Sequence, residues 1–161
     1  MAIDLKINET PLRIGAPVED LDLEGAAFRK TGLWKRLLRK LPSDVQCFEA
    51  ENCTLSCFDD ALQIYPCTHG YLTPDRQWRT RATLLIRGNR IRKVLFRIVE
   101  GHYSAVNFLE RFQELCIEHL GQPLESDRSY AQWRRDDVLV TQVLHPDRKN
   151  ADISIKLHDE A

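Results

Sequence analysis

The chain has 161 residues, of which 43% are hydrophobic and 29% charged, and its formal net charge is −1. This length and composition predict one soluble globular domain over residues 1–161 and argue against a disordered chain or a small scaffold stapled by disulfides. The first residues lack the basic and apolar regions of a secretory signal and no run approaches 18 apolar residues, so we expect a cytoplasmic protein without a membrane span.

The first predicted element is a short edge strand within "ETPLRIGAP", residues 9–17. The following stretch, "PVEDLDLEGAAFRK", fits a turn or a helix equally well, because Pro17 suits a first helical turn but little apolar periodicity follows. Neither segment carries a recognisable functional motif.

A short amphipathic helix is predicted near residues 33–41, within "TGLWKRLLRKLP". At 100° per residue its apolar side chains fall within one arc and its four cations on the opposite side, and Pro42 is expected to end it. About nine residues do not hold a helix in water alone, so we expect Trp34 and the leucines to pack inside and the cations to be solvated. Contact with a membrane or a nucleic acid is the less favoured interpretation of the same pattern.

The cysteine-rich stretch "CTLSCFDDALQIYPC", residues 53–67, predicts a hairpin that turns at Asp59 and Asp60. Five cysteines, an odd number, favour free thiols. Cys67 and His69 are spaced to share a zinc ion, but no second pair of ligands follows the usual spacing. We therefore expect no metal and no cofactor.

A stronger hairpin is predicted within residues 76–97, with Gly88 and Asn89 at its turn because both suit positive φ angles. Its charge is +8, whereas residues 41–75 carry −6. The candidate binding residues are the arginines of this basic hairpin: Arg79, Arg81, Arg87, Arg90, Arg92 and Arg97.

Strict alternation divides these arginines between the two faces of a sheet, since Arg90 and Arg92 differ in parity from Lys93 and Arg97. We expect them either to pair across strands with the acidic hairpin of residues 53–67 or to present a surface to an acidic protein.

The longest predicted helix covers residues 104–120, where apolar residues recur every three or four positions and Gly121 with Pro123 ends the pattern. We expect Leu109, Phe112 and Cys116 to be buried. A third hairpin joins "DDVLVTQVLHP" to "ADISIKLHDE". The prediction is an α+β fold: a mainly antiparallel sheet of successive hairpins with the 104–120 helix, and potentially the 33–41 helix, packed on one face.

No nucleophile, phosphate-loop, dinucleotide or zinc-protease motif occurs in the sequence, and no catalytic residue is proposed. We therefore expect a non-catalytic domain that binds another protein or a second copy of itself. The first alternative is a nucleic-acid-binding module that uses the basic hairpin of residues 76–97. The second is a small-ligand-binding or enzymatic domain with a pocket between sheet and helix.

Overall fold

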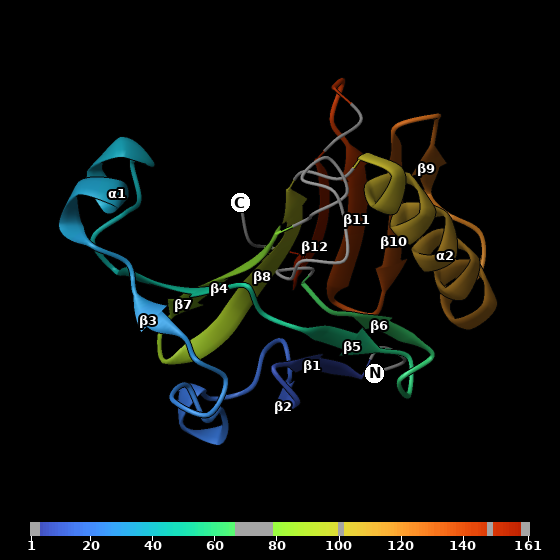
Figure 1. Cartoon of the computed structure of the whole chain (residues 1–161). Helices are drawn as coiled ribbons and strands as arrows, with labels where there is room; N and C mark the ends of the chain where they lie inside the picture. The colour runs from blue at the N-terminus through green and yellow to red at the C-terminus, as the bar shows by residue number, and fades with distance from the viewer. Residues whose placement is uncertain (1–3, 67–78, 100–101, 148–149, 159–161) are drawn as a thin grey trace.

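Two antiparallel sheets and one long helix build an α+β fold in the computed structural model (Figure 1). The structure describes residues 4–66, 79–99, 102–147 and 150–158. None of the helices in these ranges is long and apolar enough to cross a membrane.

The larger sheet has eight strands in the order β3-β4-β7-β8-β12-β11-β10-β9. In that order their bounds are Arg29–Lys30, Val45–Glu51, Arg79–Arg87, Arg90–Val99, Ala151–Leu157, Val138–Leu144, Tyr130–Arg135 and Glu125–Ser126. Every neighbouring pair is antiparallel. The sheet is therefore built largely from consecutive hairpins, as the sequence predicted.

The smaller sheet has the order β2-β1-β5-β6. Its strands are Thr10–Leu12, Leu5–Ile7, Leu55–Cys57 and Leu62–Ile64, and a short 3-10 helix, η1, covers Val18–Asp20. The predicted edge strand is confirmed as β2, and the hairpin around Asp59 and Asp60 is confirmed as β5 and β6.

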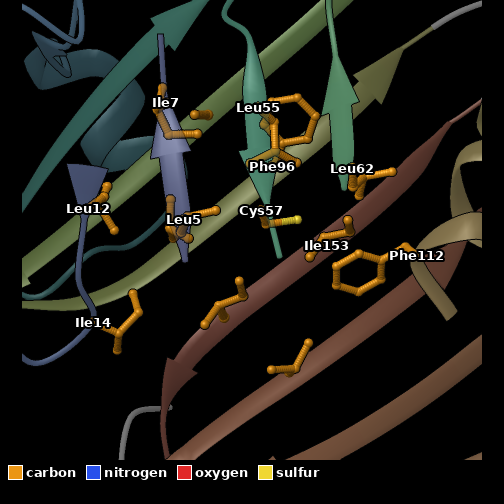
Figure 2. Packing of buried hydrophobic residues seen from close by; sticks show 14 of the residues in the cluster. Leu5, Ile7, Leu12, Ile14, Leu55, Cys57, Leu62, Phe96, Phe112 and Ile153 are labelled. Carbon is orange, nitrogen blue, oxygen red and sulfur yellow. The ribbon is translucent and has the colours of Figure 1, made fainter. Parts of the chain in front are cut away.

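One face of the larger sheet, here called the inner face, packs against the smaller sheet and against helix α2, His102–Leu120. Side chains from both sheets and from α2 gather in this core, with Leu5, Ile7 and Cys57 near Phe96, Phe112 and Ile153 (Figure 2). Phe112 meets Trp133 of β10 edge to face at 6.4 Å. Leu109, Phe112 and Cys116 are buried, as predicted.

The turn between β7 and β8 has the predicted residues and conformation. Gly88 and Asn89 have φ angles of 59° and 62°, which match a two-residue turn whose twist agrees with that of the strands. The third predicted hairpin is confirmed as β11 and β12.

The acidic hairpin does not lie beside the basic one. β5 and β6 belong to the smaller sheet, whereas β7 pairs with β4 on one side and β8 on the other. The predicted cross-strand pairing of residues 53–67 with the basic hairpin is therefore wrong. The two chain segments are neighbours in sequence but Thr54 and Leu55 turn toward Asn8 and β1 instead.

Helix α1, Leu33–Leu38, is shorter than predicted, and its Lys35, although exposed as expected, reaches Glu49 of the sheet. Lys40 has a φ of 53° and the Leu41 amide donates to the Arg36 carbonyl, so the helix ends before Pro42 in a left-handed cap. The Leu37 and Leu38 side chains are 60% and 81% exposed. The expectation that these leucines are buried is wrong; the Leu33 and Trp34 side chains lie outside the described part of the chain.

Candidate binding site

The opposite face of the larger sheet, here called the outer face, carries most of the basic side chains of β7 and β8. Thr80, Ala82, Leu84 and Ile86 of β7 are buried on the inner face, so the residues between them belong to the outer face. Residues paired across antiparallel strands share a face, which places Arg97 beside Arg81 and Arg90 beside Arg87.

A β-bulge explains why these cations share one face. The register moves from Ile86 opposite Ile91 to Leu85 opposite Lys93, which leaves Arg92 as an extra residue in β8. The extra residue resets the alternation, so Arg90 and Lys93 lie on the same face despite their different parity. The prediction that alternation divides the basic set between two faces is therefore wrong for Arg90.

A hollow of about 200 Å³ lies on the outer face where β4, β7 and β8 pass beside the end of α1. Four cations line this basic hollow: Arg39, Arg81, Lys93 and Arg97. The rest of its lining is aliphatic or weakly polar: Leu41, Cys47, Thr83, Leu85 and Leu95. Two segments far apart in the sequence, residues 39–47 and 81–97, thus meet at one site.

Arg97 is held in place by an acid of the next strand. Its Nε donates to Asp152 Oδ1 at 2.6 Å and its Nη2 to Oδ2 at 3.0 Å, a two-point contact that fixes the guanidinium plane. His145 Nε2 lies 2.8 Å from the same Oδ2. Burial raises the pKa of Asp152, but hydrogen bonds from Arg97 and His145 outweigh it and leave that pKa below its ordinary value. The hydrogen bond to Asp152 raises the pKa of Arg97, against the opposing effect of burial.

Arg39 is held by a second buried acid, Glu49 of β4. Arg39 Nη2 lies 2.6 Å from Glu49 Oε1, and Lys35 Nζ donates to Oε2 at 3.1 Å. Burial raises the pKa of Glu49. The hydrogen bonds from Lys35 and Arg39 lower it by more than burial raises it, so the pKa lies below its ordinary value. Glu49 faces outward with Cys47, so these ion pairs attach α1 to the outer face. The suggestion that the 33–41 helix covers the same face as the 104–120 helix is therefore wrong.

Arg81 differs from its neighbours because no carboxylate of the described residues lies within ion-pair distance of it. Its cross-strand partner in β8 is Arg97, another cation. Like charges directly opposite each other destabilise a sheet. The hollow is lined by four cations, and two carboxylates hold Arg39 and Arg97. The site therefore has an excess of positive charge.

The other predicted binding arginines lie away from the hollow. Arg87 Nε is 3.3 Å from Asp44 Oδ2, and Arg90 Nη1 donates to the Gly15 carbonyl at 2.9 Å. Arg79 is exposed at the start of β7, and Arg92 occupies the bulge. Of the six candidates, the structure brings Arg81 and Arg97 together.

Sequence reasoning missed Arg39, Glu49 and Asp152 as parts of the site. The charge segregation was a partial signal, since acids of residues 41–75 do meet the basic hairpin. They do so through β4, where Glu51 is opposite Arg81, and not through the cysteine-rich hairpin. Nothing local in the sequence indicates that Asp152 faces Arg97.

The core between α2 and the two sheets leaves little room for the predicted alternative of a small-ligand pocket. The void enclosed between α2 and the two sheets is about 10 Å³, lined by residues that include Phe96, Phe112 and Ile153. That volume is about the smallest that can hold one water molecule. No group of three metal-binding side chains occurs among the described residues, and Cys67 and His69 lie outside them.

The basic hollow can bind a carboxylate or phosphate through the arginine guanidinium groups, while its leucines contact an apolar group beside the anion. It offers cations but no evident nucleophile, because the Cys47 side chain on its floor is buried. Comparison with protein-family models, curated proteins and solved structures finds no match.

Proposed function

We propose that this protein is a binding module whose basic hollow receives an acidic segment of a partner protein. The observation that carries the proposal is the pairing of Arg81 with Arg97 directly across β7 and β8. An anion placed between the two guanidinium groups removes the like-charge repulsion and adds charge-assisted hydrogen bonds. Arg97 is already oriented by Asp152, so little side-chain freedom is lost when it binds.

The lining of the hollow favours a protein segment over a nucleic acid. Bases of single-stranded nucleic acids stack on aromatic rings. On the outer face the described strands carry one aromatic residue, Tyr130, and it does not line the hollow. The floor near Arg81 and Arg97 is formed by Leu85, Leu95 and Thr83. An extended segment with alternating acidic and aliphatic side chains complements this mixture of cations and leucines.

The ion pairs of Arg39 and Arg97 also favour a protein segment over a nucleic acid. Glu49 and Asp152 already pair with Arg39 and Arg97, so the net positive charge of the site is smaller than its four cations alone would give, and binding to a phosphate backbone depends mainly on such charge. The nucleic-acid alternative therefore has less support than the protein partner. Four buried free thiols, Cys47, Cys53, Cys57 and Cys116, support a reducing compartment such as the cytoplasm as the place of this interaction.

The test is fluorescence anisotropy with a labelled peptide of alternating Glu and Leu, a matched peptide of Gln and Leu, and a labelled single-stranded oligonucleotide. We expect the acidic peptide to bind and Arg81→Glu to weaken it by about tenfold or more, because the substitution places a carboxylate inside the site. The matched control is Arg134→Glu, an exposed arginine of β10, which should bind as the parent protein does.

Equal binding of the Gln peptide, or unchanged binding by Arg81→Glu, contradicts the proposal. Preferential binding of the oligonucleotide with a steep loss at high salt supports the nucleic-acid alternative instead. Sedimentation equilibrium of the protein alone separates a foreign partner from a second copy, since self-association raises the apparent mass with concentration.

A further inference from the structure

Helix α1 exposes two leucines to solvent. Leu37 and Leu38 are 60% and 81% exposed, and they stand next to each other in the chain. Among the described residues the other large exposed apolar side chains, Tyr65 and Leu124, are isolated from them in sequence. Figure 1 shows α1 at one end of the molecule, with α2 at the other.

This exposure follows from how α1 is attached. Lys35 and Arg39 lie one turn apart and both reach Glu49, so the basic side of the helix faces the sheet. At about 100° per residue, Leu37 lies about 160° around the helix from both Lys35 and Arg39, whereas Leu38 lies about 60° from Lys35. The ion pairs that hold the helix therefore direct Leu37 away from the sheet, and Leu38 beside it is also exposed.

Basic residues flank the exposed leucines in the chain. Residues 26–43 contain six Lys and Arg and no acid. Lys35 and Arg39 are paired with Glu49, and Arg36 and Lys40 are the other cations of the α1 segment. Arg29 is exposed on β3 opposite Glu49, so it lies on the face to which α1 is attached, whereas Lys30 is opposite Phe48 and lies on the other face. Figure 1 shows β3 leading into α1.

We propose that this α1 surface, formed by Arg29, Arg36, Leu37, Leu38 and Lys40, docks on an anionic lipid bilayer. Stable attachment to a membrane surface requires two signals, and the α1 surface has both: apolar side chains to enter the headgroup region and cations to meet anionic lipids. The site is distinct from the basic hollow, so this inference goes beyond the proposed function.

The shape of the surface favours a bilayer over a protein. Protein interfaces depend on anchors that fill pockets with complementary walls, whereas the leucines of α1 project from the chain. A bilayer requires no matching wall. A six-residue helix is too short to order itself on a membrane, but the Glu49 ion pairs already hold α1 before it meets lipid.

This proposal reverses what the sequence alone favoured. The argument for a docked, membrane-free helix required Trp34 and the leucines to be inside, and burial of Leu37 and Leu38 does not occur. Membrane contact therefore needs no displacement of these two side chains from a core.

The test is co-sedimentation of the full chain with vesicles of phosphatidylcholine alone and of phosphatidylcholine with phosphatidylserine, at physiological salt. We expect binding to the vesicles that contain phosphatidylserine. Leu37→Ala with Leu38→Ala, and separately Arg29→Glu with Lys40→Glu, should each weaken that binding by about tenfold or more.

Matched controls lie elsewhere on the molecule. Leu124→Ala removes another exposed leucine, 62% exposed, and Arg134→Glu with Arg135→Glu reverses two exposed cations of β10. Both controls should bind vesicles as the parent protein does. Circular dichroism checks that every variant is folded, and if the double leucine variant is not, the variant of Arg29 and Lys40 decides.

Three results overturn the proposal. The first is failure of the parent protein to sediment with the anionic vesicles. The second is binding that the α1 surface variants leave unchanged. The third is a dimer in the absence of lipid that the double leucine variant converts to a monomer, which assigns the α1 surface to a second copy of the chain.

Discussion

Helices α1 and α2 are both amphipathic, yet they contact the sheet with opposite sides. α2 buries Phe108, Phe112 and Leu115 against the inner face, whereas α1 turns Lys35 and Arg39 to the outer face and leaves Leu37 and Leu38 exposed. A periodic pattern shows that a helix has two sides. It does not show which side contacts the domain, because a buried acid on the sheet can recruit the basic side.

The two helices therefore depend on different interactions. α2 is stabilised by burial of large apolar side chains, including the edge-to-face contact of Phe112 with Trp133. α1 is attached mainly by ion pairs to Glu49, whose partners Lys35 and Arg39 have side chains that are 53% and 34% exposed. Partly exposed ion pairs contribute less than a packed core, so α1 should be the weaker of the two.

The largest expected effect is at α2. Phe112→Ala should lower the free energy of unfolding by ~3 to 5 kcal/mol, because it removes a fully buried ring and leaves a cavity. Chemical denaturation followed by circular dichroism measures the loss. Glu118→Ala on the exposed side of α2 is the control and should change stability by less than ~0.5 kcal/mol. A loss below ~0.5 kcal/mol for Phe112→Ala would contradict its place in the core.

The attachment of α1 should show a smaller effect. Glu49→Gln should cost ~1 to 2 kcal/mol, because both ion pairs are lost while Lys35 and Arg39 can still reach water. Glu51→Gln is the matched control on the same strand, where the glutamate is exposed. Equal effects of the two substitutions would mean that Glu49 does not hold the helix.

The pH dependence of the Glu49 contribution has a defined sign. Its pKa in the folded protein is below the ordinary value of 4.5, so the carboxylate stabilises the fold above pH 4.5. That stabilisation is lost as the pH falls through the folded-state pKa. The difference in stability between the parent protein and Glu49→Gln should therefore shrink on acidification, and a difference that stays constant would be evidence against the ion pairs.

The alkylation rates of two cysteines can be used to compare local opening at the two helices. Cys47 lies on the outer face next to α1, and Cys116 belongs to α2; both are buried. Burial raises the pKa of the Cys116 thiol and raises the pKa of Cys57 to about 12. In the native protein Cys47 should be alkylated faster than Cys116 by about tenfold or more, because α1 opens more readily.

Mass spectrometry of peptides after a timed reaction with iodoacetamide measures these rates. In denaturant without reductant all five cysteines should be modified, as the odd count and predicted free thiols require. Slower labelling of Cys47 than of Cys116 would show that α1 is the more protected element.

The smallest expected effect is on the exposed side of α1. Leu37→Ala with Leu38→Ala should change the free energy of unfolding by less than ~0.5 kcal/mol, because these side chains contact mainly solvent. Denaturation under the conditions used for Phe112→Ala makes the comparison direct. A loss above ~2 kcal/mol would mean that the leucines are packed, and would remove the basis for membrane docking.

The hairpins and α2 could be predicted because their signals are local. Gly88 and Asn89 specify a turn, and the apolar spacing of residues 104–120 specifies a helix side. Strand β4 gave no such signal. Ala50 is buried on the inner face of β4. Cys47 and Glu49 are buried on its outer face because the α1 segment covers them. The alternation that marks a half-exposed strand is therefore missing.

The candidate site was harder to predict because its residues come from distant strands. Arg81 and Arg97 were among the expected binding residues, but their partner Asp152 is 55 residues from Arg97. Arg39 lies at the hollow and pairs with Glu49, a contact that the helical pattern of residues 33–41 does not indicate. Such non-local pairings depend on strand order, which periodicity does not contain.

The bulge at Arg92 has a consequence for changes in chain length. Strand β8 absorbs one surplus residue between Ile91 and Lys93 without disturbing its alignment with β12, where Phe96 stays opposite Ile153. Deletion of Arg92 would remove the irregularity and still leave Lys93 opposite Leu85. The start of β8 should therefore tolerate the loss of one residue, whereas the same change near Phe96 would exchange buried and solvent-facing residues along the rest of the strand.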